Sequence, residues 1–367
     1  MNIPSPYQED LFRKLALRND VDLHVIYHSR IGQERRRIGW EESLEGYKYT
    51  FLNHPKPLTA VKWAIARREQ LHIINGIWAL PSFTIALVIL ATIASNPCFV
   101  YTEASNPTRR RSAIRLLVRN GIGTLIARCP HVYVLAVSSL AVAQLKAIGF
   151  PEERIYPFGY FRECPPCNGL PISSSGNKMV YVGQLIQRKG LDILLEAMTP
   201  LWYRYPDLSL DIIGEGPERR VVERYIQEHP YARITMFGPV SSAKIFEAIA
   251  GHDLLILPSR FDGWGIVVNE ALALGIPVVV SSACGTADLI LHGRNGYIFK
   301  SGDPSSLRAC LIEFMSLNQE ERERMRQSAL RTGELIRMDV IVDYLIRCIR
   351  HAIGSESRPE PPWRLTK

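Results

Sequence analysis

The chain has 367 residues, of which 47% are hydrophobic and 22% charged, and its formal net charge is +8. These proportions are typical of a soluble globular protein, and the length exceeds what one ordinary hydrophobic core holds. Seven scattered cysteines exclude a disulfide-stapled scaffold and fit a reducing cytoplasm. We therefore expect two α/β domains.

The first half alternates short apolar runs with helical or loop segments. Its predicted strands are VDLHVIYH (21–28), YKYTFLN (47–53), HIIN (72–75), CFVYTE (98–103) and VYVLAVS (132–138). This alternation predicts a parallel sheet covered by helices on both faces. Parallel sheets of this kind bind ligands at the carboxyl ends of their strands.

One apolar run, residues 77–94, is uncharged for 18 residues and approaches the length of a membrane span. Pro81 interrupts it, and strand-like runs flank it on both sides. We therefore predict a buried helix of a strand–helix–strand unit. The first ten residues carry no basic segment followed by an apolar stretch, so no signal peptide is expected.

The positive charge is concentrated in residues 1–165, which hold 21 Lys or Arg and 13 Asp or Glu, whereas the remainder is balanced. The densest segment, 108–128, predicts a basic amphipathic helix, and a second cluster spans 35–37. Its basic residues are Arg109, Arg110, Arg111, Arg115 and Arg119. Such a helix either attracts an anionic membrane surface or is simply solvated. Nucleic acid is not expected, because aromatic residues are not interleaved with the basic ones.

A Pro/Gly/Ser-rich stretch, residues 164–178, predicts the interdomain linker. It contains a single Cys164-Pro-Pro-Cys167 motif, which without a partner pair does not indicate zinc. The following domain has five predicted strands. They are MVYVGQL (179–185), LSLDIIG (208–214), RITMFG (233–238), LLILPS (254–259) and PVVVSS (277–282).

The most informative stretch runs from Arg260 to Asp288, where Glu270 is the only charged residue between 263 and 287. A carboxylate in so apolar a run needs a polar partner, because its burial is otherwise costly. Asp262 precedes a Gly-Trp-Gly turn, after which a helix is expected near Gly265. These features indicate a ligand site at a loop and helix N-terminus. The alternative is structural, with Asp262 capping the helix and Glu270 meeting backbone amides.

The segment Asp262-Gly-Trp-Gly-Ile-Val-Val-Asn-Glu270-Ala-Leu-Ala-Leu-Gly-Ile-Pro-Val-Val resembles the signature of retaining glycosyltransferases of family 4, with Asp in place of the first Glu. Three further motifs follow the family's order, and the similarity is strong over residues 178–316. They are VYVGQLIQRKGLDILLEAM (180–198), LDIIGEGPERR with ITMFGPV (210–220 and 234–240), and GTADLILHGRNGYIF (285–299).

The resemblance implies the GT-B architecture, in which two Rossmann-like doubly wound parallel-sheet domains face each other across a cleft. It places an acceptor-binding domain at 1–163 and a nucleotide-sugar-binding domain at 179–337. A C-terminal helix near 338–353 packs back on the first domain in this architecture.

The resemblance also implies the roles of individual residues. Lys189, with Arg188 beside it, matches the phosphate-binding lysine, and Asp262 would bind donor-sugar hydroxyls. Glu270 would bind the ribose, and Glu103 is the candidate polar residue of the first domain near the sugar. Gln184 stands where the family usually has Arg, which makes Lys189 more important. The remaining donor-binding candidates are the backbone of Gly238 and Pro239 for the base, and the amides of Gly263, Trp264 and Gly265 for the sugar or diphosphate.

The only Asp-x-Asp triplet, Asp20-Val-Asp22, is interpreted as structural, so a metal-independent reaction without a cofactor is expected, with the nucleotide-diphosphate sugar as co-substrate. The expected function is retaining transfer of a sugar to a glycan or polyprenyl-linked acceptor in surface polysaccharide biosynthesis, lipopolysaccharide included. The protein is expected in the cytoplasm, peripheral on the inner face of the membrane.

Two other functions stay open. One is a catalytically weak homologue that binds nucleotide sugar or scaffolds an assembly. The other is a nicotinamide dehydrogenase, which GEGPERR (214–220) hardly supports because it lacks the third glycine. Either the chain start is incomplete or the first strand is minimal, and Pro4 to Tyr7 is then the expected diphosphate loop.

Overall fold

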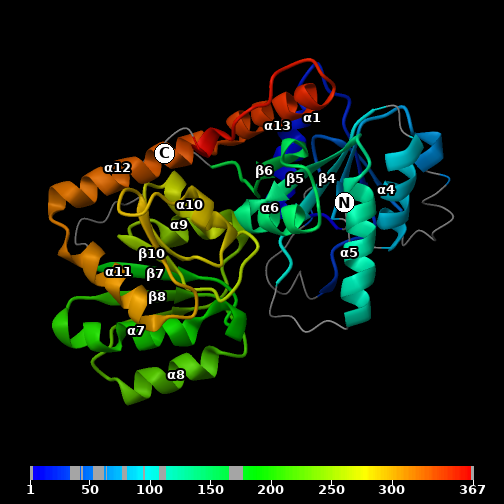
Figure 1. The fold of residues 1–367 in the computed structure, drawn as a ribbon. Helices are drawn as coiled ribbons and strands as arrows, with labels where there is room; N and C mark the ends of the chain where they lie inside the picture. The colour runs from blue at the N-terminus through cyan, green and yellow to red at the C-terminus, as the bar shows by residue number, and fades with distance from the viewer. Residues whose placement is uncertain are drawn as a thin grey trace. The chain divides into compact units, whose positions relative to one another are not determined.

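The computed structural model describes residues 3–33, 42, 44–52, 62, 64–76, 81–93, 96–106, 113–164 and 177–364. The chain divides into two compact units (Figure 1). Unit 1 holds the described residues up to Phe161 together with those from Met338 on. Unit 2 holds those from Arg162 to Arg337.

Unit 1 contains all five strands predicted for the first half, and a sixth, β6, that was not predicted. Its strands are β1 (His24–Tyr27), β2 (Lys48–Phe51), β3 (His72–Asn75), β4 (Cys98–Glu103), β5 (Val132–Val137) and β6 (Ile155–Phe158). Its helices are α1 (Pro6–Ala16), α4 (Pro81–Ile93), α5 (Ala113–Ala127), α6 (Ser138–Ala147) and α13 (Met338–Ala352), with short 3-10 turns η1 (Glu152–Arg154) and η5 (Pro362–Arg364). The expected loop Pro4 to Tyr7 is only half right, because α1 begins at Pro6, a residue whose fixed φ suits a first helical turn.

The described part of the apolar run 77–94, Pro81–Ile93, forms helix α4 between the parallel strands β3 and β4, as predicted. Leu87 and Leu90 are fully buried, while Ile93 at its end is exposed. Across the part of the chain that the structure describes, no helix is both long and apolar enough to cross a bilayer.

The strands of unit 1 form two separate parallel sheets, where the sequence pattern suggested one. Strands β3, β4, β5 and β6 lie side by side in that order, and β1 pairs with β2 alone. The backbone hydrogen bonds of β4 and β5 extend over six residue pairs, from Cys98 opposite Val132 to Glu103 opposite Val137. This long central ladder makes the four-stranded sheet the core of the unit.

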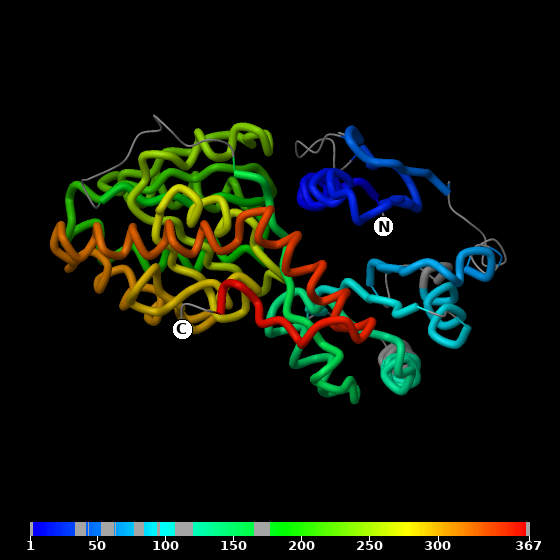
Figure 2. Tube along the Cα trace, turned by 90° about the horizontal axis from the view of Figure 1, so that it is seen from above, coloured from blue at the N-terminus to red at the C-terminus, as the bar shows by residue number. Residues whose placement is uncertain are grey.

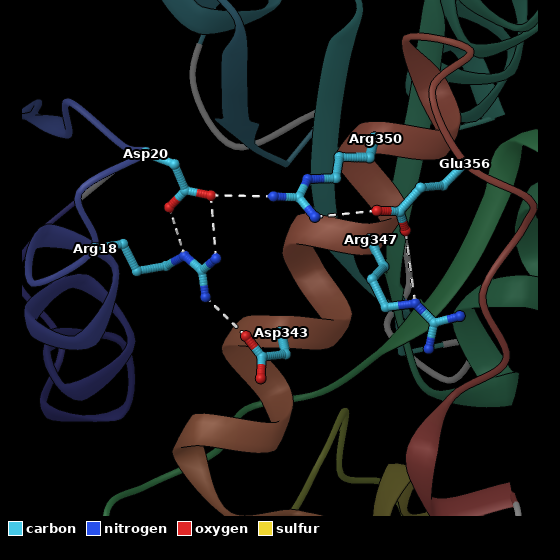
Figure 3. A network of polar contacts seen from close by, with 6 residues as sticks. All are labelled: Arg18, Asp20, Asp343, Arg347, Arg350 and Glu356. Atoms are coloured by element: carbon cyan, nitrogen blue, oxygen red, sulfur yellow. Dashed lines mark hydrogen bonds and ion pairs between the residues drawn. The ribbon is translucent and has the colours of Figure 1, made fainter.

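Helix α13 is tied to the segment between α1 and β1 by a network of ion pairs (Figure 3). Arg18 binds Asp343 at 2.7 Å, and Arg350 reaches Asp20 at 3.2 Å and Glu356 at 3.0 Å. Asp20 therefore has arginine partners, and Asp22 binds Lys48 at 2.7 Å. Both carboxylates of the Asp-x-Asp triplet thus hold cations of unit 1.

Unit 2 is built on one six-stranded parallel sheet in the order β12-β11-β10-β7-β8-β9. Its strands are β7 (Lys178–Val182), β8 (Ser209–Ile213), β9 (Ile234–Phe237), β10 (Leu254–Leu257), β11 (Val278–Ser281) and β12 (Gly296–Phe299). Its helices are α7 (Leu191–Arg204), α8 (Arg219–Glu228), α9 (Ile245–Ile249), α10 (Val267–Ala273), α11 (Pro304–Ser316) and α12 (Gln319–Leu335), with 3-10 turns η2 (Gln187–Lys189), η3 (Ser242–Lys244) and η4 (Gly285–Leu289). The β10 strand is buried along its whole length, as a run of four apolar residues in a parallel sheet requires.

Candidate functional site

The strand order of unit 2 reverses between β7 and β10. From β7 the chain proceeds to β8 and β9 on one side, and later returns to β10, β11 and β12 on the other. The loops that leave the carboxyl ends of β7 and β10 therefore diverge, and such switch points are where open α/β sheets bind ligands. Lys189 follows β7 and Asp262 follows β10, so both lie at this position.

Lys189 and Asp262 are in direct contact. The Lys189 ammonium lies 2.5 Å from the Asp262 carboxylate, and each side chain is 14% exposed. Arg188 lies 3.9 Å from the same carboxylate and donates a 2.7 Å hydrogen bond to the carbonyl of Phe261. The two loops are thus joined by a cationic and an anionic side chain that remain partly accessible to a ligand.

Two glycines allow the loops to approach. Gly190 has φ +70°, and a Cβ there would lie 2.2 Å from the carbonyl oxygen of Pro258. Gly265 has φ +95°, and a Cβ there would lie 2.6 Å from Leu257 and 3.3 Å from the Thr286 hydroxyl. Only glycine fits both the conformation and the space. The α10 helix begins at Val267, two residues later than expected, because Gly265 is left-handed.

Glu270 is 3% exposed on α10, as its apolar surroundings predicted. Its partner is the guanidinium of Arg162, which also donates a 3.1 Å hydrogen bond to the carbonyl of Ser242 and lies over the Phe246 ring. The structural alternative from the sequence is wrong on both counts. Asp262 does not cap α10, whose N-cap is Ile266 without a side-chain bond, and Glu270 meets a side chain.

Burial raises the pKa of Glu270 to about 7, and the charge and hydrogen bond of Arg162 act in the opposite direction. The buried atoms around these loops that have no hydrogen-bond partner among the described residues include the Nε of Arg162 and the hydroxyl of Thr286. Buried polar groups are normally paired, so these two are available to a bound molecule or water.

Sequence reasoning missed Arg162 and Thr286. Thr286 lies in the GTADLILHGRNGYIF motif, which was a signal for it. Arg162 belongs to none of the sequence motifs named above, and it lies 108 positions from Glu270 in the sequence. No local pattern therefore indicated that the two side chains would pair.

The other donor-binding candidates also follow the carboxyl ends of strands in the unit 2 sheet. The backbone carbonyl of Gln184 accepts a 2.9 Å hydrogen bond from Tyr181. Gly238 and Pro239 follow β9 and are exposed. Gly263 is buried, and the indole of Trp264, also buried, donates to Asn269 at 3.1 Å. Trp264 can therefore offer a ligand its backbone rather than its ring.

Glu103 belongs to unit 1, at the exposed end of β4, and accepts a 3.2 Å hydrogen bond from Tyr160. Beside it in the sheet, β5 ends at Val137, and the next residue, Ser138, has φ +75°. The Ser138 hydroxyl is buried and has no partner among the described residues. A strained non-glycine residue with a free hydroxyl at a strand end is a feature of functional sites.

Some sequence predictions fall outside the described residues. They concern the basic clusters at 35–37 and 109–111, the side chains of Arg115 and Arg119, and nearly all of the 164–178 linker with Cys167. These remain predictions.

Residues 168–332 match the family model of glycosyl transferases group 1. The chain is 26% identical over 204 residues to the putative colanic acid biosynthesis glycosyltransferase WcaL of Salmonella typhimurium, covering 52% of this chain and 49% of WcaL. It is 31% identical over 152 residues to alpha-D-kanosaminyltransferase of Streptomyces kanamyceticus, covering 41% of this chain and 39% of that enzyme. The matched stretch therefore spans less than half the length of these curated relatives.

Among solved structures, Anabaena Alr3699/HepE in complex with UDP is similar over 97% of this chain and 100% of its own, with a TM-score of 0.71 and 16% sequence identity. At this identity the likeness shows the fold. Residues 168–332 thus match the model of glycosyl transferases group 1, and the chain as a whole has the GT-B fold of two Rossmann-like α/β units.

Proposed function

We propose that the protein is a retaining, metal-independent glycosyltransferase that moves a sugar from a nucleotide-diphosphate sugar to a glycan or lipid-linked acceptor. The observation that carries the proposal is the Lys189–Asp262 pair at the switch point of unit 2, inside the segment that matches the family. The similarity to a protein solved in complex with UDP and to a putative colanic acid biosynthesis glycosyltransferase favours a nucleotide-sugar donor and a surface polysaccharide.

In this proposal Lys189 binds the diphosphate and stabilises the charge that develops on it as the sugar departs. A phosphate competes with Asp262 for the lysine, so donor binding frees the carboxylate to accept hydrogen bonds from sugar hydroxyls. Arg188, fixed on the Phe261 carbonyl, holds the two loops together beside the diphosphate. Glu270 accepts a hydrogen bond from the ribose, and Arg162 favours its charged form by lowering its pKa.

Two features of unit 1, Glu103 and the basic segment 108–128, complete the proposed function. Glu103 would act beside the donor sugar, and the basic segment 108–128 would hold the protein at an anionic membrane on the cytoplasmic side. Vesicle binding of the whole chain, with and without anionic lipid, tests the second point.

The donor site is tested by thermal unfolding with UDP, GDP and ADP, with and without EDTA. A ligand at 100 times its dissociation constant stabilises the folded protein by about 2.7 kcal/mol. We expect one nucleotide to shift the midpoint, insensitively to EDTA, and Lys189→Met to abolish the shift. Lys178→Met is the matched control, because Lys178 stands at the opposite, amino end of β7.

Asp262→Asn separates the roles of the two partners. Because it releases Lys189, free nucleoside diphosphate should bind several-fold more tightly, while the preference for the nucleotide sugar over the diphosphate falls. Binding without release of free nucleoside diphosphate from any donor would instead favour a nucleotide-sugar-binding homologue. No shift with any of the three nucleotides on folded protein would refute the donor site.

A further inference from the structure

Thr286 carries a buried hydroxyl that has no hydrogen-bond partner among the described residues. The residue is 0% exposed and stands in the 3-10 turn η4 of unit 2. Such a group is unusual, because buried hydroxyls normally make at least one hydrogen bond and an unpaired one is costly. The hydroxyl therefore calls for a partner that the free protein does not supply.

The backbone fixes Thr286 relative to Asp262. The loop that holds Asp262 and the segment that leads to Thr286, both in the yellow part of the tube in Figure 2, run parallel and are joined by backbone hydrogen bonds of 3.0 Å. The amide of Asp262 donates to the carbonyl of Ala283, and the amide of Gly285 donates to the carbonyl of Asp262. The amide of Thr286 donates to the carbonyl of Trp264. The two residues are therefore held in one register.

The side chains of Thr286 and Asp262 approach each other beside Gly265. A Cβ built on this glycine would lie 3.3 Å from the Thr286 hydroxyl oxygen and 3.7 Å from Oδ2 of Asp262, so both atoms border one small space. The hydroxyl is unpaired there, and Oδ2 lies 2.5 Å from the Lys189 ammonium. Thr286 is thus close to the carboxylate, which is engaged elsewhere.

Donor binding deprives Asp262 of this lysine, because the diphosphate competes for Lys189. The other carboxylate oxygen, Oδ1, lies 3.9 Å from Arg188, beyond hydrogen-bond distance, and that guanidinium donates to the carbonyl of Phe261. The Asp262 side chain is only 14% exposed, so water replaces the lysine incompletely. A carboxylate in such surroundings is costly unless another polar group takes the place of the cation.

We infer that Thr286 is a positioning residue for Asp262, an inference that rests on the donor site of the proposed function. When the diphosphate takes Lys189, the Asp262 side chain turns and its carboxylate accepts a hydrogen bond from the Thr286 hydroxyl. The carboxylate thereby stays ionised and held in place, where it can bind hydroxyls of the donor sugar. The hydroxyl is unpaired in the free protein because its partner is still bound to the lysine.

Thr286→Val tests this exchange, because it removes the hydroxyl and keeps a branched side chain of similar size. Binding of UDP, GDP and ADP is measured by calorimetry on the wild type, Thr286→Val and Thr286→Ser. The nucleotide that binds the wild type should bind Thr286→Val about tenfold more weakly or worse, since a hydrogen bond to a charged group contributes at least that factor. Thr286→Ser keeps the hydroxyl and should restore the affinity of the wild type.

The thermal midpoint of the free protein separates this role from a structural one. Removal of an unpaired buried hydroxyl should leave the midpoint unchanged or raise it. Thr332→Val is the matched control, because this buried hydroxyl donates to the carbonyl of Ser328 at 3.1 Å and accepts from Asn295 at 2.9 Å. It should lower the midpoint and leave nucleotide binding unchanged. If Thr286→Val lowers the midpoint as much as Thr332→Val, the hydroxyl is already satisfied in the free protein and the inference is wrong.

The same substitution in an Asp262→Ala background identifies the partner of the hydroxyl. Without the carboxylate, Thr286→Val should change the nucleotide affinity by less than about twofold. A loss that persists in this background would mean that the hydroxyl contacts the nucleotide itself, and would overturn the inference. Unchanged binding by Thr286→Val, with binding abolished by Lys189→Met, would reject the role of Thr286 and leave the donor site intact. Absence of nucleotide binding by the folded wild type would refute the donor site and this inference with it.

Discussion

Replacing Arg162 by Met tests the ion pair that lies beneath the candidate site. The guanidinium binds the Glu270 carboxylate, and both side chains are nearly buried, at 13% and 4% exposed. Methionine keeps much of the apolar stem but removes the charge and the hydrogen bonds. At pH 5, where Glu270 is protonated in the folded protein, the cost is that of the lost hydrogen bonds, about 1 kcal/mol.

The pH dependence follows from the raised pKa of Glu270. Its folded value is about 7 against an ordinary 4.5, so the folded state binds the proton more tightly than the unfolded state. The contribution of this group to stability is therefore full below about pH 4.5 and is lost as the pH rises, by about 3 kcal/mol at pH 7. In the wild type this loss of stability levels off above pH 7, because Glu270 then releases its proton in the folded protein as well as in the unfolded one.

In Arg162→Met the folded pKa of Glu270 is higher still, because the two influences that lower it are gone. The loss then continues above pH 7 by about 1.4 kcal/mol for each pH unit. We expect the destabilisation by Arg162→Met to grow by about 1.5 kcal/mol between pH 7 and pH 8.5.

Urea unfolding followed by tryptophan fluorescence at pH 5, 7 and 8.5 measures this difference. Arg260→Met is the control, because Arg260 binds Asp192 in an exposed pair that lowers the pKa of Asp192, so its effect should be flat over this range. A destabilisation by Arg162→Met that stays constant or shrinks from pH 7 to 8.5 would refute the reasoning.

Three further predictions concern stability. Gly190→Ala should cost at least 1–3 kcal/mol, because its Cβ would meet a backbone carbonyl, whereas Gly238→Ala, with open space, should cost under 1 kcal/mol; chemical denaturation compares them. Asn318→Ala should destabilise α12 by about 1 kcal/mol in the same assay, since it removes a capping box. Arg18→Ala should destabilise the protein only slightly, and the cost should shrink in 1 M salt because the ion pairs are exposed.

Local sequence patterns predicted the described strands of both units except β6 and β12, because short apolar runs between turn residues describe buried parallel strands without reference to the rest of the chain. The burial of Glu270 was predictable in the same way, since the other residues of its helix are apolar except Asn269. The partner of Glu270 was not predictable from the sequence. Arg162 is the first described residue of unit 2, far from α10 in sequence, and a single arginine after a strand has no periodicity that marks it.

The division of the unit 1 strands into two sheets was also not predictable from the sequence. The apolar alternation of β1 and β3 is the same whether another strand lies between them or not, because alternation records which faces are buried and carries no information on edge pairing. Only the three-dimensional arrangement shows that β1 and β2 form a sheet separate from that of β3, β4, β5 and β6.

The two carboxylates of the signature share one physical arrangement despite their different depths. Asp262, near the surface, holds Lys189, and Glu270, in the interior, holds Arg162. An unpaired carboxylate at the candidate site would repel the phosphates of a donor because both are negatively charged. A carboxylate paired with a cation leaves the site with almost no net charge. The Asp262 carboxylate is 14% exposed and the Glu270 carboxylate only 4%, so we expect a phosphate to displace Asp262 from Lys189 while the Glu270–Arg162 pair stays in place. The difference in burial therefore assigns exchange to the outer pair and positioning to the inner one.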